Sequence, residues 1–100
     1  MSDSTAGFTL VPTWMFMSED VTAHMILVYG ALGTLIDRDG AAWPSTKGLA
    51  MIAKISGSAV RSALRDLEAM GLVETVVRDV DEYGRKSNMY RLYFGRRAVA

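Results

Sequence analysis

The spacing of hydrophobic positions divides the chain into helices followed by strands. From residue 21 to residue 36 nearly every side chain is apolar. Ser18 is a favourable N-cap ahead of this run, and the acids Glu19 and Asp20 suit the positive end of a helix dipole. The pattern therefore predicts a long, largely buried helix from Ser18 to about Ile36.

The residues ahead of this helix show no clear periodicity. Residues 1–7 are small and polar, and we expect a disordered N-terminus there. Residues 8–11 suit a short strand or a packed arm, and Pro12 ends it and opens a turn of helix over residues 13–16. Three aromatic side chains are expected to anchor the core beneath the long helix: Trp14, Phe16 and Trp43.

Two shorter helices are predicted in the middle of the chain. Ser45 caps the first of them. Its buried side is expected to consist of Leu49, Ala50, Ile52 and Ala53. Residues 54–57 interrupt the helical pattern, Ser56 caps the next helix, and Gly71 suits the glycine position just beyond its end.

The second of these helices has one apolar face and one basic face. Its apolar positions follow the i, i+3, i+4, i+7 spacing of a helix face: Val60, Ala63, Leu64 and Leu67. The polar side chains share the opposite side: Ser58, Arg61, Ser62 and Arg65. We therefore expect one face to pack in the core and the other to remain in solvent.

After Gly71 the apolar positions recur at every second residue, which is typical of strands. Residues 72–77 and 88–94 are rich in valine, tyrosine and leucine, and residues 78–87 hold Gly84 among charged residues. These segments predict a β-hairpin with a long tip. The predicted fold class is α+β, with three main helices followed by a hairpin.

Two short helices joined by a tight turn and followed by a hairpin are the element order of a winged helix-turn-helix. The sequence adds a WPS entry at residues 43–45, a GLV exit at residues 71–73 and a wing, residues 84–92, that ends in SNMYRL. Further matching positions lie on the helix pair: Leu49, Ala50, Ser56, Val60, Leu64 and Leu67. Together these motifs resemble the winged helix-turn-helix domains of bacterial phage, plasmid and replication-initiator proteins. The resemblance covers residues 8–94 and leaves residues 95–100 as a C-terminal tail.

The sequence departs from that family at several positions. Lys54 stands where the family often has glycine in the turn, and Ala59 where it often has threonine near the start of the recognition helix. Three acids lie near the tip of the predicted wing: Asp79, Asp81 and Glu82. These differences reduce the positive charge expected on the side of the domain that carries the recognition helix and the wing.

The resemblance implies sequence-specific binding of double-stranded DNA. A helix in the major groove needs exposed donors that reach base edges, and Arg61 and Arg65, one turn apart, meet this need. Arg85 and Lys86 at the wing tip suit phosphate contacts. The full candidate set is Ser45, Thr46, Lys47, Ser56, Ser58, Arg61, Ser62, Arg65, Arg85 and Lys86.

The uneven charge distribution is compatible with an anionic partner on the second half of the chain, whereas the apolar helix and the reduced positive charge on the DNA-facing side favour a second copy as partner. The formal net charge is zero, but residues 1–44 sum to −4 and residues 45–100 to +4. A helix that is apolar almost all round is difficult to cover within 100 residues, so a homodimer is expected. Its interface is predicted to include Val21, Met25 and Val28, with Gly30 and Gly33 admitting another helix.

Other function classes find little support in the sequence. There is one histidine and no cysteine, so no metal site, cofactor or enzymatic activity is expected. The absence of cysteine and the polar N-terminus favour a cytoplasmic protein that does not enter a membrane. Two binding functions stay open: a DNA-binding regulator or replication or excision factor of a mobile element, and a winged-helix module that binds protein through its acidic first half.

Overall fold

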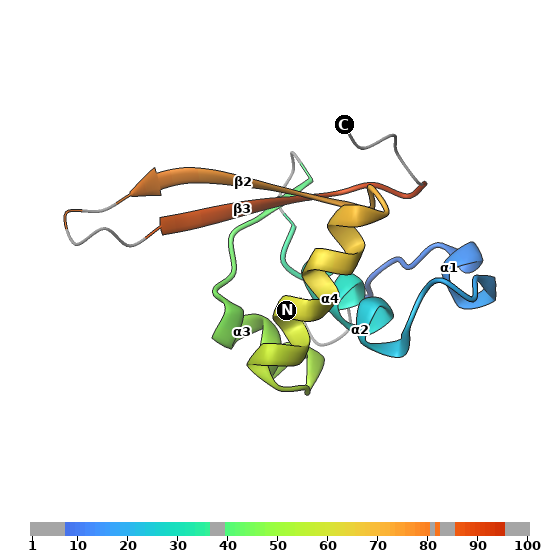
Figure 1. Ribbon diagram of the computed structural model, residues 1–100. Coiled ribbons are helices and arrows are strands. Elements are labelled where there is room, and N and C mark those ends of the chain that lie inside the picture. The colour runs from blue at the N-terminus through green and yellow to red at the C-terminus, as the bar shows by residue number, and fades with distance from the viewer. Residues whose placement is uncertain (1–7, 37–39, 81, 83–85, 96–100) are drawn as a thin grey trace.

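The computed structural model describes residues 8–36, 40–80, 82 and 86–95 (Figure 1). Within them, the helices are α1 (Thr13–Met17), α2 (Ala23–Gly33), α3 (Thr46–Ala53) and α4 (Gly57–Ala69). The strands β1 (Ala41–Ala42), β2 (Val73–Val80) and β3 (Lys86–Leu92) form an antiparallel sheet in the order β1-β3-β2. The predicted α+β class, with a helix pair followed by a hairpin, is confirmed.

The core forms where α2, α3 and α4 pack against one another and against the base of the sheet. The predicted apolar stripe of α4 is fully confirmed, since all four of its residues are buried: Val60, Ala63, Leu64 and Leu67. On α3, Leu49 and Ala53 are buried as expected. The prediction that Ile52 is buried is wrong, because its side chain is 40 % exposed on the solvent side of that short helix.

The start of α2 differs from the prediction. Thr22, and not Ser18, is its N-cap, and the Thr22 hydroxyl accepts a hydrogen bond from the Met25 amide at 3.2 Å. The Ser18 hydroxyl instead accepts from the amide of Asp20 at 3.2 Å, in the turn that follows α1. Serine side chains compete with helical bonding in this way, so a good capping residue marks more than one kind of turn.

An N-terminal arm, residues 8–12, crosses α2. Of the two possibilities that the sequence allowed for this segment, a short strand or a packed arm, the structure shows the packed arm. The Thr9 hydroxyl donates to the carbonyl of Gly30 at 2.9 Å. A Cβ at Gly30 would lie 3.6 Å from Val11 and 3.7 Å from Thr9, and a Cβ at Gly33 would collide with the Thr9 hydroxyl. The two glycines of α2 therefore admit the chain's own arm rather than another helix.

The β2–β3 hairpin forms the wing and is longer than predicted. Its register runs from Val73 opposite Leu92 to Val80 opposite Lys86, with an irregularity between Val77 and Asp79. The strands extend away from the helices (Figure 1). The alanines of β1 pair with the inner end of β3, a strand that two small residues could not reveal in the sequence.

Of the three aromatic anchors expected, Trp14 packs against the core, whereas Phe16 and Trp43 do not. Phe16 is 62 % exposed and Trp43 is 49 % exposed, while Tyr29 and Tyr90 are buried in their place. The half-buried Trp14 ties α1 to the end of the wing, since its indole N–H donates to the carbonyl of Phe94 at 2.8 Å. Indole and phenol rings carry a polar group that usually finds a hydrogen-bond partner when the ring is buried, as Trp14 and Tyr29 do here.

Tyr29 makes a similar tie from α2. Its hydroxyl donates to the carbonyl of Tyr93 at 2.8 Å. Burial raises the pKa of Tyr29 to about 12, because the charged phenolate loses the water that would solvate it. The neutral, donating phenol is therefore the form that holds α2 to the end of the wing.

The contact between the arm and α2 predicts opposite effects for two similar substitutions. Gly30→Ala makes only ordinary contacts and gains helix propensity, so we expect it to raise stability by up to about 1 kcal/mol. Gly33→Ala must push away the Thr9 hydroxyl and lose its hydrogen bond, which costs about 0.5–1.5 kcal/mol. In urea unfolding, the free energy of unfolding of Gly33→Ala should therefore be lower than that of Gly30→Ala.

Thr9→Ala provides the control for this pair. It removes both the hydroxyl and its hydrogen bond, so the two glycine substitutions should have closely similar effects in a Thr9→Ala background. Equal unfolding midpoints of Gly30→Ala and Gly33→Ala in the otherwise unchanged chain would show that the arm does not lie on α2 as described.

Candidate nucleic-acid interface

A tight turn holds α3 and α4 at a fixed angle. Lys54 ends α3 in the left-handed region, with φ of 64°, and its amide donates to the carbonyl of Ala50 at 2.8 Å. Ser56 then caps α4, since its hydroxyl accepts from the amide of Ala59 at 3.1 Å. Ser45 caps α3 in the same way, through the amide of Gly48 at 3.0 Å. All three assignments agree with the sequence.

The outer face of α4 carries the predicted polar side chains. The buried stripe described above fixes the rotation of the helix, so the opposite face lies in solvent. All four candidate residues of this face are exposed: Ser58, Arg61, Ser62 and Arg65. Asp66 is exposed on the same helix and offsets part of their charge. The face thus combines two guanidinium groups with two short hydroxyl side chains.

The structure brings the beginnings of α3 and α4 together. An added Cβ at Gly57, the first residue of α4, would lie 3.6 Å from an Nη atom of Arg61 and 3.9 Å from Cγ2 of Thr46. Arg61 therefore lies over the first turn of α4, close to the start of α3. Lys47 is exposed in that same turn of α3. The position of Gly57 between Arg61 and Thr46 could not be predicted, because a glycine after a capping serine is common to many helix starts.

Ser45 and Ser56 have a structural role that limits what they can offer a ligand. Each hydroxyl oxygen already accepts a hydrogen bond from a backbone amide. The Ser56 oxygen also lies 3.4 Å from that of Ser58. A hydroxyl that accepts in a cap keeps its hydrogen as a donor, so both serines can still donate to an anionic group.

The base of the wing is fixed by side-chain hydrogen bonds. The Thr75 hydroxyl donates to the carboxylate of Glu68 on α4 at 2.7 Å, and the Tyr93 hydroxyl donates to Glu74 at 2.9 Å. Lys86 begins β3, opposite Val80. Arg85 lies outside the described residues, as do the predicted disordered N-terminus, residues 1–7, and residues 96–100 of the predicted tail.

Asn88 is a polar residue of the wing whose side chain the sequence did not single out. Its amide nitrogen lies 3.4 Å from the hydroxyl of Tyr90, and its side-chain oxygen is buried without a hydrogen-bond partner. The only hint was its place in the SNMYRL motif.

The predicted dimer interface is wrong for two of its three residues. Met25 is 1 % exposed and Val28 is 0 % exposed, because both pack in the core of a single copy. Val21 is half-buried against the same core. One face of α2 packs against α3, α4, the sheet and the arm, while Leu27 on the same helix is 44 % exposed.

The described residues form neither a metal site nor a membrane-spanning helix. No cluster of three or more histidine, cysteine, aspartate or glutamate side chains there could hold a metal ion. None of the described helices has the length and apolar character needed to cross a membrane.

Solved structures resemble this fold, although no family model and no curated protein matches the sequence. An N-terminal domain of a DNA-binding protein has 21 % identity and a TM-score of 0.65, over 94 % of this chain and 79 % of that one. A structure of a Rep–DNA complex has 21 % identity and a TM-score of 0.64, over 95 % and 81 %. The fold is a winged helix-turn-helix.

A third similar structure is a possible transcriptional regulator from Methanosarcina mazei Go1. It has 19 % identity and a TM-score of 0.58, and the match covers 74 % of this chain. The match spans only 57 % of the length of that protein. In the winged helix-turn-helix fold, α3 and α4 form the helix pair, α4 takes the position of the recognition helix, and β2 and β3 form the wing.

The left-handed turn residue yields a prediction about stability. A non-glycine residue at positive φ carries a steric cost of about 1–2 kcal/mol, which glycine avoids. Glycine also loses more conformational entropy on folding, and this loss offsets part of the gain. Lys54→Gly should therefore raise the free energy of unfolding by up to about 1 kcal/mol in urea. Lys54→Ala removes the same charge but keeps the strain, so it should give no gain. A Lys54→Gly variant no more stable than Lys54→Ala would contradict the turn geometry.

Proposed function

We propose that this protein binds double-stranded DNA in a sequence-specific manner, as a transcriptional regulator or as a replication or excision factor of a phage or other mobile element. The observation that carries the proposal is the division of α4 into two faces. Its apolar stripe is buried, and Arg61 and Arg65 lie exposed on the other side. The proposed role is binding without catalysis, and a DNA ligand is consistent with the cytoplasmic location expected from the sequence.

In the proposed complex, α4 lies in the major groove, which is wide enough for one helix. Arginine there makes its commonest specific contact, a bidentate pair of hydrogen bonds to the O6 and N7 atoms of guanine. Ser58 and Ser62 are short enough for the helix backbone to come close to the base edges. Thr46, at the start of α3, lies near Arg61, and Thr46 and the exposed Lys47 suit phosphate contacts that position the helix.

The wing supplies the second part of the proposed interface. β2 and β3 extend beyond the helices in the direction of α3 (Figure 1). The hydrogen bond between Thr75 and Glu68 links the wing to α4, so their relative orientation is held before any ligand binds. Arg85 and Lys86 would then contact phosphates, which affects affinity more than choice of sequence.

The similar structures support this proposal through what they are. One is a possible transcriptional regulator, one is a domain of a DNA-binding protein and one is a Rep protein in complex with DNA. Identities near 20 % mean that the likeness itself concerns the fold. The proposal therefore depends on the charged outer face of α4.

A protein-binding module is the second candidate, and one observation favours it. Met51 is 71 % exposed and Ile52 is 40 % exposed on α3. Apolar side chains gain more from a protein surface than from a phosphate backbone. The zero net charge also removes the overall attraction to nucleic acid that many DNA-binding domains have.

Binding to random and selected duplexes at several salt concentrations tests the choice between these candidates. Because each neutralised phosphate contributes a slope of about 0.9 in log K against log salt, a DNA-binding domain should lose affinity by orders of magnitude between about 50 and 200 mM salt. Arg61→Ala/Arg65→Ala should bind the selected sequence much more weakly and lose its preference, since each bidentate contact contributes about 1–3 kcal/mol of discrimination.

Arg96→Ala/Arg97→Ala is the charge-matched control, because it removes two arginines from the tail and leaves α4 unchanged. It should retain the sequence preference of the unchanged protein. Circular dichroism of each variant establishes that it is folded. Equal binding of all three proteins to DNA at low salt, or no binding by any, would exclude α4 as a DNA-reading helix and favour the protein-binding module.

A further inference from the structure

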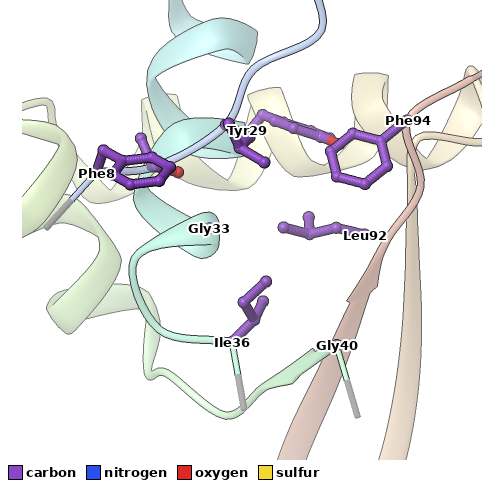
Figure 2. Close-up of a pocket in the computed structure, with 9 residues that line it drawn as sticks. Phe8, Tyr29, Gly33, Ile36, Gly40, Leu92 and Phe94 are labelled. Atoms are coloured by element: carbon purple, nitrogen blue, oxygen red, sulfur yellow. The ribbon is translucent and has the colours of Figure 1, made fainter. Parts of the chain in front are cut away.

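An apolar cavity of about 240 Å3 lies on a part of the molecule that the proposed DNA contact does not use. The arm contributes Phe8, Thr9 and Leu10 to its lining, and none of its lining residues belongs to α3 or α4. Figure 2 shows Phe8 on one side and Phe94 on the other, with Leu92 and Ile36 below them in this view. The cavity is thus formed where the arm, the end of α2 and the end of the wing meet.

The chemistry of the lining calls for an apolar occupant. Thr9 and Tyr29 are the polar side chains among the lining residues, and both hydroxyls are already engaged. Thr9 donates to the carbonyl of Gly30 and Tyr29 donates to that of Tyr93. The rest of the wall is hydrocarbon and glycine, so water inside it would find few hydrogen-bond partners.

The rim of the cavity is also apolar and strongly exposed. Phe8 is 85 % exposed, Phe94 62 %, Leu10 60 % and Ile36 41 %. The two phenylalanines alone expose roughly 300 Å2, at about 150–250 Å2 per aromatic side chain. That is already the size of the largest apolar patch of an ordinary monomer, about 300–600 Å2, and such patches mark interaction sites. A small molecule inside the cavity would leave this rim in water.

We propose that a second copy of this chain covers the patch formed by Phe8, Leu10, Ile36, Phe94 and the cavity between them. A two-fold interface uses the same surface on both copies, so that surface must carry both protruding and hollow parts. In this patch the exposed rings of Phe8 and Phe94 are the protruding parts and the cavity is the hollow part. An apolar cavity of about 150 Å3 already admits a benzene ring, so the cavity of about 240 Å3 has room for a phenylalanine ring of the other copy.

Size and charge agree with this occupant. A standard interface buries about 800 Å2 per partner, somewhat more than half of it apolar. The exposed rim and the cavity wall together approach that apolar share. The formal net charge of zero means that two copies approach without overall repulsion. The inference replaces the interface expected on Val21, Met25 and Val28, and it does not depend on the DNA-binding proposal.

Sedimentation in the absence of DNA tests the inference, so its failure and a failure of the DNA-binding proposal give different results. The unchanged chain should be a dimer at about 10–100 μM. Phe94→Asp and Phe8→Asp should each shift it to monomer, because a carboxylate would be buried without a partner. The backbone hydrogen bond from Trp14 to Phe94 does not involve the substituted side chain.

Phe16→Asp is the matched control. Phe16 has the same residue type and the same 62 % exposure as Phe94, but it does not line the cavity. The Phe16→Asp variant should therefore remain a dimer, and circular dichroism should show that all three variants are folded. A monomeric unchanged chain would overturn the inference, and so would a dimer that persists in Phe94→Asp or one that Phe16→Asp also dissociates. If indole binds a monomeric chain and Leu92→Phe prevents this, the cavity is a small-molecule site instead.

Discussion

The burial of one face of α4 is the interaction on which the rest of this structure depends. Val60, Leu64 and Leu67 pack against α2 and α3, and each truncation of such a leucine to alanine costs about 2–5 kcal/mol. A domain of this size has about 5–15 kcal/mol of stability in total. The same burial sets the rotation of α4, so Arg61 and Arg65 are exposed because the opposite side of the helix is apolar.

The wing depends on a second group of contacts at its inner end. Trp14 and Tyr29 donate to consecutive carbonyls, those of Phe94 and Tyr93, and the Tyr93 amide donates to Leu72 at 2.9 Å. These bonds join α1, α2 and the start of β2 to the end of β3. The outer part of the hairpin extends beyond the helices (Figure 1), so its direction is set by this inner end.

The sequence predicted best those features that depend on local chemistry. The caps at Ser45 and Ser56, the glycine after α4 and the apolar stripe of α4 all follow from spacing and backbone hydrogen bonding within a few residues. The predicted cap at Ser18 failed because a serine hydroxyl can close a turn as readily as it can start a helix. Ser18 stands at the end of α1, and its hydroxyl accepts from the amide of Asp20 instead of capping α2.

Features that depend on distant contacts could not be predicted. The apolar circumference of α2 suggested a second copy, but Met25, Val28 and Tyr29 are buried by other parts of the same chain. Gly30 and Gly33 signalled a close approach correctly, and only the structure shows that Thr9 makes it. The cavity between Phe8 and Phe94 joins residues from opposite ends of the sequence. For the candidate DNA contacts, the helix positions were predictable, whereas the proximity of Thr46 and Arg61 was not.

The molecule thus has two separate surfaces. One is the outer face of α4 with the start of α3, and the other is the apolar patch around Phe8 and Phe94, beyond the C-terminal end of α2. The most direct test of the first is backbone amide chemical-shift mapping by NMR during titration with a duplex selected for binding, at low salt. The account predicts that the largest changes fall on residues 46–47, 57–65 and the hairpin, while the arm and Phe94 change little. Largest changes around Phe8, Ile36 and Phe94, or none on α4, would contradict it.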